Sequence, residues 1–183
     1  MSEKYRIKSL DELYFVTFST VNWIDVFTRN EYKDIFLESL RFCQEKKDMD
    51  VHAYCIMTNH AHLIVSTRGR PLPETIRDMK QFTAKRILKA IQDNPDESRK
   101  DWMLWMFARA GRKIASNEIH QFWQHHSHPI ELFTPEMTAQ KLDYIHNNPV
   151  KAGFVNNPCD WTYSSARKYH ADEKLPLDII LIE

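Results

Sequence analysis

Glycine is scarce in this sequence, with only 3 among 183 residues. Phosphate-binding loops of the P-loop and Rossmann kinds need several glycines at fixed spacing, so both kinds of nucleotide site are excluded. An excess of charge is also missing, because 25 Lys and Arg balance 25 Asp and Glu. Any contact with nucleic acid must therefore come from a local basic patch and not from the charge of the whole chain.

Cysteines and long apolar runs are equally rare. The cysteines are Cys43, Cys55 and Cys159, which lie far apart and form no Cys-X-X-Cys pair. This usage disfavours a disulfide framework or a thiolate zinc site and fits a reducing cytosol. No segment approaches the roughly 18 apolar residues of a membrane span, and the N-terminus lacks the apolar stretch of a signal peptide. We therefore expect a soluble, cytoplasmic protein with no membrane partner.

The remaining composition is that of an ordinary globular domain. Hydrophobic residues make up 43% and charged residues 27%, which is enough for a real core. No internal repeat, low-complexity segment or linker interrupts the chain. We expect a single domain over residues 1–183, with a core at about 13–169 and a tail at 170–183.

Hydrophobic periodicity predicts alternating strands and helices in the first half of the chain. The predicted segments are 13–20 (strand), 30–46 (helix), 51–57 and 61–66 (strands) and 72–92 (helix). Thr28 or Asn30 is a candidate N-cap for the first helix, and Pro73 suits the start of the second. The short break between the second and third strands indicates an antiparallel hairpin.

The second half predicts fewer regular elements. The predicted segments are 102–114 (helix), 119–123 and 130–132 (short strands), a helix from Thr134 that Pro149 ends, and 177–182 (strand or surface packing). The whole order favours an α+β sandwich, with an antiparallel sheet and helices mainly on one face. The ferredoxin-like split βαβ arrangement is the leading specific version.

Two histidines separated by one residue are the most informative local pattern. Side chains alternate between the faces of a strand, so His60 and His62 should point the same way. Two imidazoles on one face of a rigid strand would supply half of a metal site. The alternative is a pair of half-exposed histidines at a hairpin, because one such pair among 9 histidines is not rare. A third ligand must come from elsewhere.

A tyrosine and an asparagine one helical turn apart form the second pattern. Tyr144 and Asn148 share a helix face, and the amide oxygen of Asn148 is a hard ligand suited to Mg²⁺ or Mn²⁺. An ordinary phenol, with a pKa of about 10, attacks a phosphodiester only with help, which a divalent ion can give. Covalent catalysis by tyrosine then yields a phosphotyrosine. The alternative is a core aromatic with its hydroxyl at water, and periodicity alone does not decide.

Basic residues gather in three groups that could neutralise DNA phosphates. They are Arg77, Lys80, Lys85, Arg86 and Lys89; Arg109, Arg112 and Lys113; and Lys151 with Arg167 and Lys168. Acidic neighbours make ordinary solvated helix faces the alternative. The aromatic residues Phe122, Trp123 and Trp161 could stack on unpaired bases or be buried. A histidine cluster at 120–128 has no regular ligand spacing, which favours a polar hairpin loop or a DNA-contacting turn over a second metal site.

Three stretches, in this order, carry a resemblance to a known family. They are residues 54–65 around the histidine pair, residues 143–155 around Tyr144, and residues 161–167. Together they resemble the strand-borne His-hydrophobic-His block, the tyrosine helix and the ending of the single-tyrosine HUH transposases. This family includes the small insertion-sequence transposases and their repeat-associated (REP) relatives. The resemblance covers roughly residues 13–169.

The resemblance implies a ferredoxin-like fold and metal-dependent nicking and joining of single-stranded or hairpin DNA. Carried over by position, His60 and His62 are metal ligands, and Asn148 takes the place of a third, amide-type ligand for Mg²⁺ or Mn²⁺. Tyr144 is the nucleophile, which forms a 5′-phosphotyrosine and leaves a 3′-hydroxyl. A homodimer is the family's frequent arrangement, although some repeat-associated members act as monomers.

Two departures from the family pattern bear on this reading. Thr58 stands where many members have proline, and residues 92–119 lack the glycine-containing segment of many relatives. The second departure leaves DNA specificity and oligomeric state open. The alternatives are a DNA-binding protein of the same fold that has lost catalysis, and a zinc hydrolase that uses an activated water.

Overall fold

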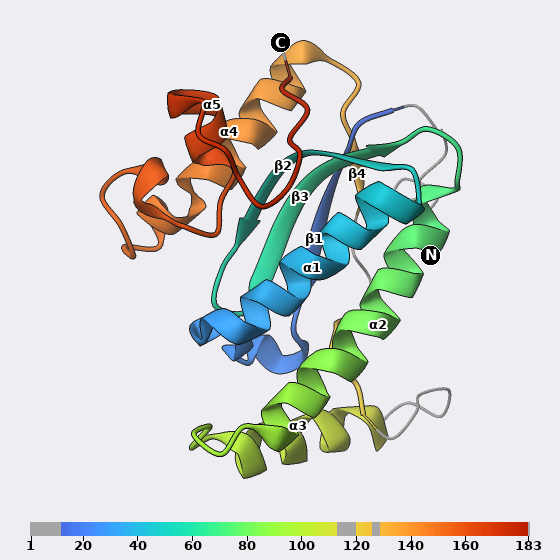
Figure 1. Cartoon of the computed structure of the whole chain (residues 1–183), viewed down its shortest axis with the longest axis vertical. Helices are drawn as coiled ribbons and strands as arrows, with labels where there is room; N and C mark the ends of the chain where they lie inside the picture. The colour runs from blue at the N-terminus through green and yellow to red at the C-terminus, as the bar shows by residue number, and fades with distance from the viewer. Residues whose placement is uncertain (1–11, 113–119, 126–128, 183) are drawn as a thin grey trace.

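A four-stranded antiparallel sheet forms the centre of the molecule (Figure 1). The computed structural model describes residues 12–112, 120–125 and 129–182. The strands are β1 (Tyr14–Ser19), β2 (Met49–Ile56), β3 (His60–Thr67) and β4 (Ile130–Glu131). Their order in the sheet is β2-β3-β1-β4, so β3 lies between the two strands that α1 connects. This is the predicted α+β fold of the ferredoxin-like split βαβ type.

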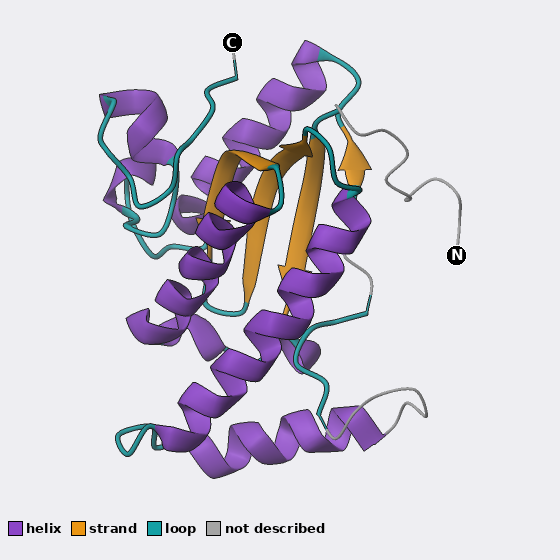
Figure 2. Cartoon of the chain, turned by 45° about the vertical axis from the view of Figure 1, so that its right-hand side comes forward, coloured by secondary structure: helices purple, strands orange, loops and turns teal. Residues whose placement is uncertain are grey.

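Helices cover both faces of this sheet (Figures 1 and 2). The helices are α1 (Asn30–Lys46), α2 (Leu72–Asp93), α3 (Lys100–Arg112), α4 (Pro135–Lys151) and α5 (Ala166–Ala171). Short 3-10 turns are η2 (Val21–Trp23), η3 (Val26–Thr28) and η4 (Pro158–Asp160). Helices α1 and α2 pack on one face, as predicted, and α4 packs on the other.

Strand β3 shows how the sequence assigns side chains to these two faces. Ala61, Leu63 and Val65 belong to the large core under α1 and α2. Ile64 belongs to the smaller core on the opposite face, together with Ile145 of α4. Because side chains alternate along a strand, His60 and His62 lie on the same face as Ile64, beneath α4.

Most predicted elements are confirmed, including the helix at 30–46 and the β2–β3 hairpin. The predicted N-cap of α4 is also confirmed, since Thr134 Oγ1 accepts a hydrogen bond from the Met137 amide at 3.2 Å. The N-cap prediction for α1 was wrong, because Arg29 occupies that position without a side-chain hydrogen bond. The helix predicted at 102–114 is α3, and its last predicted residues lie outside the described ones.

Pro149 does not end α4, contrary to the prediction, because the helix continues to Lys151. A proline this close to the end of a helix removes only one hydrogen bond of the last turn. The chain turns away at Gly153 instead, whose φ of 76° is left-handed and whose amide bonds to the Val150 carbonyl at 3.0 Å.

The strand predicted at 119–123 was also wrong. Ile119 lies outside the described residues, and the rest of the segment forms only one isolated bridge, between Trp123 and Thr20. The apolar side chain of Trp123 is buried in the core, where its indole N–H donates a hydrogen bond to Thr83 Oγ1 at 3.0 Å. Of the two alternatives predicted for 177–182, surface packing is confirmed: Ile179 forms an isolated bridge with Val51, and the Ile180 amide bonds to the Val51 carbonyl at 3.1 Å.

No helix in the described parts of the chain combines the length and the apolar character that crossing a bilayer requires.

Candidate active site

His60 and His62 lie side by side on β3, as their spacing predicts. The centroids of their rings are 4.7 Å apart. The ring of His62 is stacked on Phe15 of the neighbouring strand β1, with centroids 5.3 Å apart, and only 5% of His62 is exposed. The sheet therefore holds the two imidazoles together and largely shields one of them from water.

His62 has one ring nitrogen bonded and the other free. Its Nδ1 lies 2.9 Å from Thr17 Oγ1 on β1, while its Nε2 is buried without a hydrogen-bond partner. Burial, with smaller contributions from His60 and Lys141, lowers the pKa of His62 to about 3. The ring is therefore neutral at pH 7, which is the form that binds metal ions.

The Nδ1 atom of His60, like that of His62, has a side-chain hydrogen-bond partner. Its Nδ1 lies 2.7 Å from Asn59 Oδ1. Burial lowers the pKa of His60, and a side-chain hydrogen bond with Asn148 partly opposes this effect. The predicted third ligand, Asn148, therefore reaches the histidine pair from α4.

Tyr144 also reaches the pair from α4, within the same chain. Its ring centroid is 5.1 Å from that of His62 and 5.9 Å from that of Phe15. Tyr144 is 38% exposed, so molecules in solution can reach it. The next residue, Ile145, is fully buried against the sheet and anchors the helix in this position. The four residues predicted from two distant sequence patterns thus converge.

Two lysines of α4 add positive charge beside the phenol. Lys141 Nζ lies 5.6 Å from the ring centroid of Tyr144 and 4.8 Å from that of Phe15. Lys151 Nζ lies 5.9 Å from the Tyr144 ring. The sequence prediction included Lys151 but missed Lys141, although its position three residues before Tyr144 places both on one helix face.

The gathered side chains offer two imidazoles and one amide oxygen to a cation. No cluster of three or more His, Cys, Asp or Glu residues suited to a metal occurs in the described parts of the chain. The buried, unpartnered Nε2 of His62 is the atom that a metal would satisfy. The donor set fits a divalent cation that keeps open positions for substrate, because it supplies few protein ligands.

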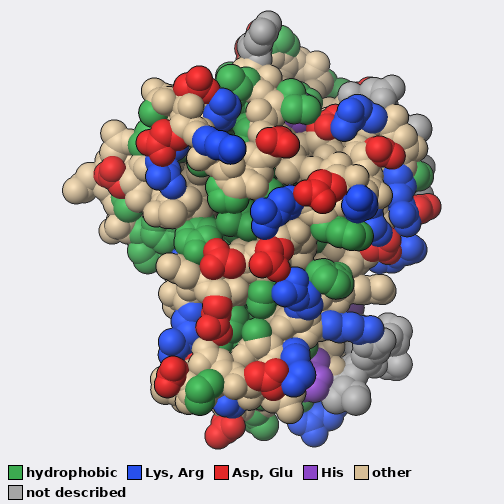
Figure 3. All heavy atoms as spheres, viewed as in Figure 1, with side chains coloured by type: hydrophobic (Ala, Val, Ile, Leu, Met, Phe, Trp, Pro, Cys, Tyr) green, Lys and Arg blue, Asp and Glu red, His purple; other side chains and the backbone are tan. Residues whose placement is uncertain are grey.

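The basic residues predicted on α2 lie across the sheet from this site. Arg86 pairs with Glu38 at 2.8 Å and Lys89 with Asp93 at 2.6 Å. Lys80 points inward and donates to the Gln124 carbonyl at 3.0 Å, and burial lowers its pKa to about 8. Arg77 and Lys85 are exposed on the same helix. Figure 3 shows positive and negative side chains interspersed on the face seen in Figure 1.

Other residues predicted to contact DNA lie on α3 and in the segment that follows it. On α3, Arg109 lies over the Trp105 ring at 5.2 Å and Arg112 is exposed, while Lys113 lies outside the described residues. Phe122 and Trp123 are buried, which excludes base stacking on them in this conformation. Of the histidine cluster at 120–128, residues 126–128 lie outside the described residues.

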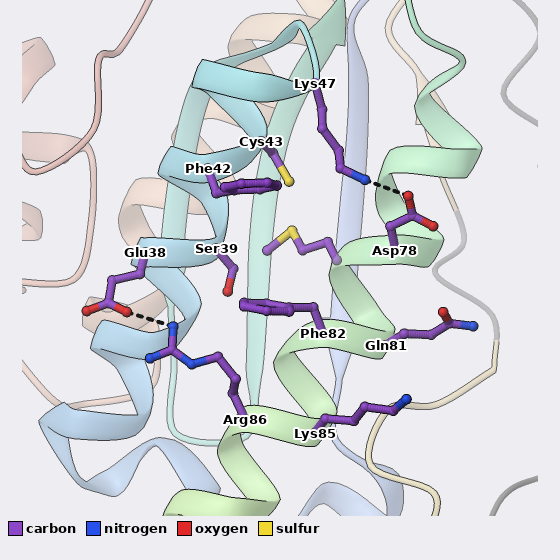
Figure 4. A pocket seen from close by; sticks show the side chains of 11 residues that line it. Glu38, Ser39, Phe42, Cys43, Lys47, Asp78, Gln81, Phe82, Lys85 and Arg86 are labelled. Atoms are coloured by element: carbon purple, nitrogen blue, oxygen red, sulfur yellow. Dashed lines mark hydrogen bonds and ion pairs between the residues drawn. The ribbon is translucent and has the colours of Figure 1, made fainter.

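A cavity of about 580 Å³ lies between α1 and α2 (Figure 4). Its walls include Phe42 and Phe82, and its rim carries the ion pair of Lys47 with Asp78, at 2.5 Å. Since α1 and α2 cover the opposite face of the sheet, this cavity is separate from the histidine pair.

Comparison with known proteins finds a family model, a curated relative and a solved structure that resemble this chain. A family model described as "Transposase IS200 like" matches residues 12–109. A Haemophilus influenzae protein named as a REP-associated tyrosine transposase is 29% identical over 147 residues, which are 79% of this chain and 70% of that protein. A solved structure of a REP-associated tyrosine transposase bound to a REP hairpin aligns with a TM-score of 0.65 and 16% identity, covering 100% of this chain and 94% of that one.

These matches bear on different parts of the molecule. The family model spans β1 to α3 and includes the histidine pair, but it stops before Tyr144. The solved structure, at 16% identity, supports the fold and not the assignment of single residues.

Proposed function

The chain belongs to the family of IS200-like transposases, and from this premise we propose that it cleaves and rejoins single-stranded DNA with a divalent metal and Tyr144. The observation that carries the proposal is the meeting of Tyr144 with His62 at 5.1 Å between ring centroids, within one chain. A tyrosine, two imidazoles and an amide come from segments that are far apart in sequence. Such a meeting supports a shared chemical task for them.

The histidine pair and Asn148 would hold the metal in this proposal, and its identity would be Mg²⁺ or Mn²⁺. When bound, the ion would polarise the scissile phosphate and offset its negative charge. Burial lowers the pKa values of both imidazoles, so both rings are neutral at pH 7. Neither ring therefore has to lose a proton before it binds the metal ion.

Tyr144 would act as the nucleophile. Its phenolic oxygen forms a bond to the phosphorus while the bond from phosphorus to the 3′ oxygen breaks. The phenolic proton passes to solvent, and the leaving oxygen takes up a proton to become a 3′-hydroxyl. The product is a 5′-phosphotyrosine, and attack by another 3′-hydroxyl reverses the step and joins the strands. The amines of Lys141 and Lys151 are near enough to this ring to attract the phosphate.

The proposed substrate is single-stranded or hairpin DNA. The solved relative carries a REP hairpin, and a fold shared over the full length of this chain supports a similar substrate. The basic residues of α2 and α3 remain predicted DNA contacts at a distance from the site. A homodimer also remains a prediction. The four central side chains meet within one chain, so the proposed chemistry does not require a residue from a second copy.

The decisive experiment incubates the full chain with a hairpin oligonucleotide that has single-stranded flanks, in the presence of Mn²⁺. We expect a covalent protein–DNA adduct on a denaturing gel that is absent in Tyr144→Phe. Tyr163→Phe is the matched control, since its hydroxyl bonds to Asp34 at 2.8 Å and the same atom is removed outside the site. That control should form the adduct as the wild type does.

The other outcomes separate the alternatives. DNA binding by the wild type without any adduct would identify a DNA-binding protein that has lost catalysis. Strand hydrolysis that survives Tyr144→Phe would identify an activated water as the nucleophile. Either result overturns the proposed role of Tyr144.

A further inference from the structure

We infer that Asp25 and Asn59 are positioning residues that fix the ring orientation and tautomer of His60. The inference rests on the proposed function, in which His60 binds the metal through Nε2. The three side chains form a chain of hydrogen bonds that leads from the surface to the site. Asn59 Nδ2 lies 3.0 Å from Asp25 Oδ1, and Asn59 Oδ1 lies 2.7 Å from His60 Nδ1.

The direction of these hydrogen bonds follows from what each group can do. The Asp25 carboxylate only accepts hydrogen bonds, and so does the Trp23 carbonyl, which lies 3.4 Å from the same Asn59 nitrogen. The NH₂ group of Asn59 must therefore face them, and its carbonyl oxygen must face His60. That oxygen can only accept, so His60 Nδ1 carries the hydrogen and Nε2 of the neutral ring carries the lone pair.

The backbone holds Asn59 in place for this task. Its carbonyl accepts hydrogen bonds from both the amide and the hydroxyl of Thr20, each at 3.0 Å. The preceding carbonyl, of Thr58, accepts from the Phe27 amide at 2.8 Å. The loop that carries Asp25 is thus attached directly to the strand end that carries His60.

The loop itself adopts a costly conformation. Asn22 and Trp23 have φ values of 53° and 55°, a left-handed region that is uncommon for residues other than glycine. Arg99 holds the loop from the other side, because its Nη1 donates to the Asp25 carbonyl at 2.8 Å. The Trp23 ring meets the His60 ring with centroids 5.9 Å apart. The surroundings therefore fix a strained turn whose Trp23 ring contacts His60.

A structural role alone would not account for this network. Asp25 is exposed and Asn59 is half-buried, and hydrogen bonds at such positions contribute little to folding stability. Partners of metal-binding histidines, by contrast, commonly change metal affinity by about 10- to 100-fold when they are removed. The two roles therefore predict different measurements.

The test measures Mn²⁺ binding to the full chain without DNA, by electron paramagnetic resonance. Asn59→Leu should weaken binding by about 10- to 100-fold. Asp25→Ala should weaken it less, because Asn59 keeps the Trp23 carbonyl as a partner. The exchange variant Asp25→Asn with Asn59→Asp reverses the hydrogen bond between positions 25 and 59 but keeps an oxygen acceptor facing His60 Nδ1. Its affinity should return to within a few fold of the wild type.

Asn94→Leu is the matched control for these variants. Asn94 donates to Glu31 Oε1 at 2.7 Å, so the substitution removes an amide hydrogen bond at the end of α2, which packs on the opposite face of the sheet from the histidine pair. It should leave Mn²⁺ affinity unchanged, whatever its effect on stability. Thermal melts of all variants identify any that fail to fold, and Asp25→Ala then carries the test in place of Asn59→Leu.

A second measurement separates this inference from the proposed function. Nitrogen-15 NMR of the metal-free protein should show His60 with its hydrogen on Nδ1, and a mixture of tautomers in Asn59→Leu. If tautomer and affinity are unchanged in Asn59→Leu while the wild type binds Mn²⁺, the inference is wrong and the proposed metal site stands. If the wild type binds no Mn²⁺ but the tautomer depends on Asn59, the metal site is wrong and the positioning role stands.

Discussion

Two buried histidines on neighbouring strands differ in how their ring nitrogens are paired. His52 on β2 and His62 on β3 are 9% and 5% exposed. Both nitrogens of His52 have partners, with Nδ1 3.1 Å from the Ile180 carbonyl and Nε2 2.9 Å from Ser66 Oγ. His62 has Thr17 at Nδ1, but its Nε2 has no partner.

The difference distinguishes a structural histidine from a functional candidate. Buried polar atoms in proteins nearly always have hydrogen-bond partners, and leaving one without a partner costs about 1–3 kcal/mol. His52 sits at the irregularity between Val51 and Ala53, where it connects β2 to β3 and to the C-terminal segment. His62 instead keeps one nitrogen available beside Tyr144. Burial alone, which the two share, does not reveal function.

The largest predicted effect comes from removing the free nitrogen itself. His62→Phe keeps a ring of similar size against Phe15 but removes both nitrogens. We expect Mn²⁺ affinity to fall by more than about 100-fold, beyond the usual effect of an outer-sphere partner. DNA cleavage should be lost, and the melting temperature should stay close to that of the wild type. Calorimetric titration with Mn²⁺ and a thermal melt measure both properties.

His52→Phe is the corresponding change at the other histidine. It removes two hydrogen bonds and leaves Ser66 and the Ile180 carbonyl without their partner. We expect a loss of about 2–3 kcal/mol in unfolding free energy with unchanged Mn²⁺ affinity. If both variants lose metal affinity equally, or if only His62→Phe unfolds, the distinction between the two histidines is invalid.

A smaller effect is expected at Thr17, the partner of His62 on β1. Thr17→Val keeps the shape but removes the hydroxyl that pairs with Nδ1, so the ring can rotate or change tautomer. Mn²⁺ affinity should fall by about 10- to 100-fold. Thr17→Ser keeps the hydroxyl and should bind nearly as the wild type does. Equal affinities for Val and Ser would show that this hydrogen bond does not orient His62.

The sequence predicted the regular elements well because they depend on local patterns. Alternation in β3 correctly placed His60 and His62 on one face, and helical spacing correctly placed Tyr144 and Asn148 together. Neither pattern could show that the two pairs meet, because that depends on how α4 packs on the sheet. The family resemblance supplied this expectation, and the ring contacts agree with it.

The residues that sequence reasoning missed act over long separations in the chain. Thr17 lies 45 residues from His62, and Asp25 lies 34 residues from Asn59. No local periodicity connects such pairs. Charge patterns likewise do not reveal which face of the sheet a helix covers, so Lys80 resembled a DNA contact although its amine points inward.

The smallest predicted effect is a pH dependence of stability that belongs to His52. Burial lowers the pKa of His52, while the Ile180 carbonyl and the charge of Asp50 act in the opposite direction. Asp50 itself pairs with Arg68 at 3.2 Å. An imidazole in the unfolded chain has a pKa of about 6.5, so below this pH the unfolded state binds more protons than the folded state. The contribution of His52 to stability is therefore present above pH 6.5 and declines as the pH falls.

This dependence should become weaker in His52→Phe, because the substitution removes the proton that only the unfolded state takes up. The measurement compares urea unfolding at pH 7 and pH 5 for the wild type and the variant, with a chelator present so that no metal contributes. We expect the wild type to lose more stability between these pH values than the variant loses. Equal losses would mean that His52 titrates alike in the folded and unfolded states, and its burial would then be too shallow to support the comparison with His62.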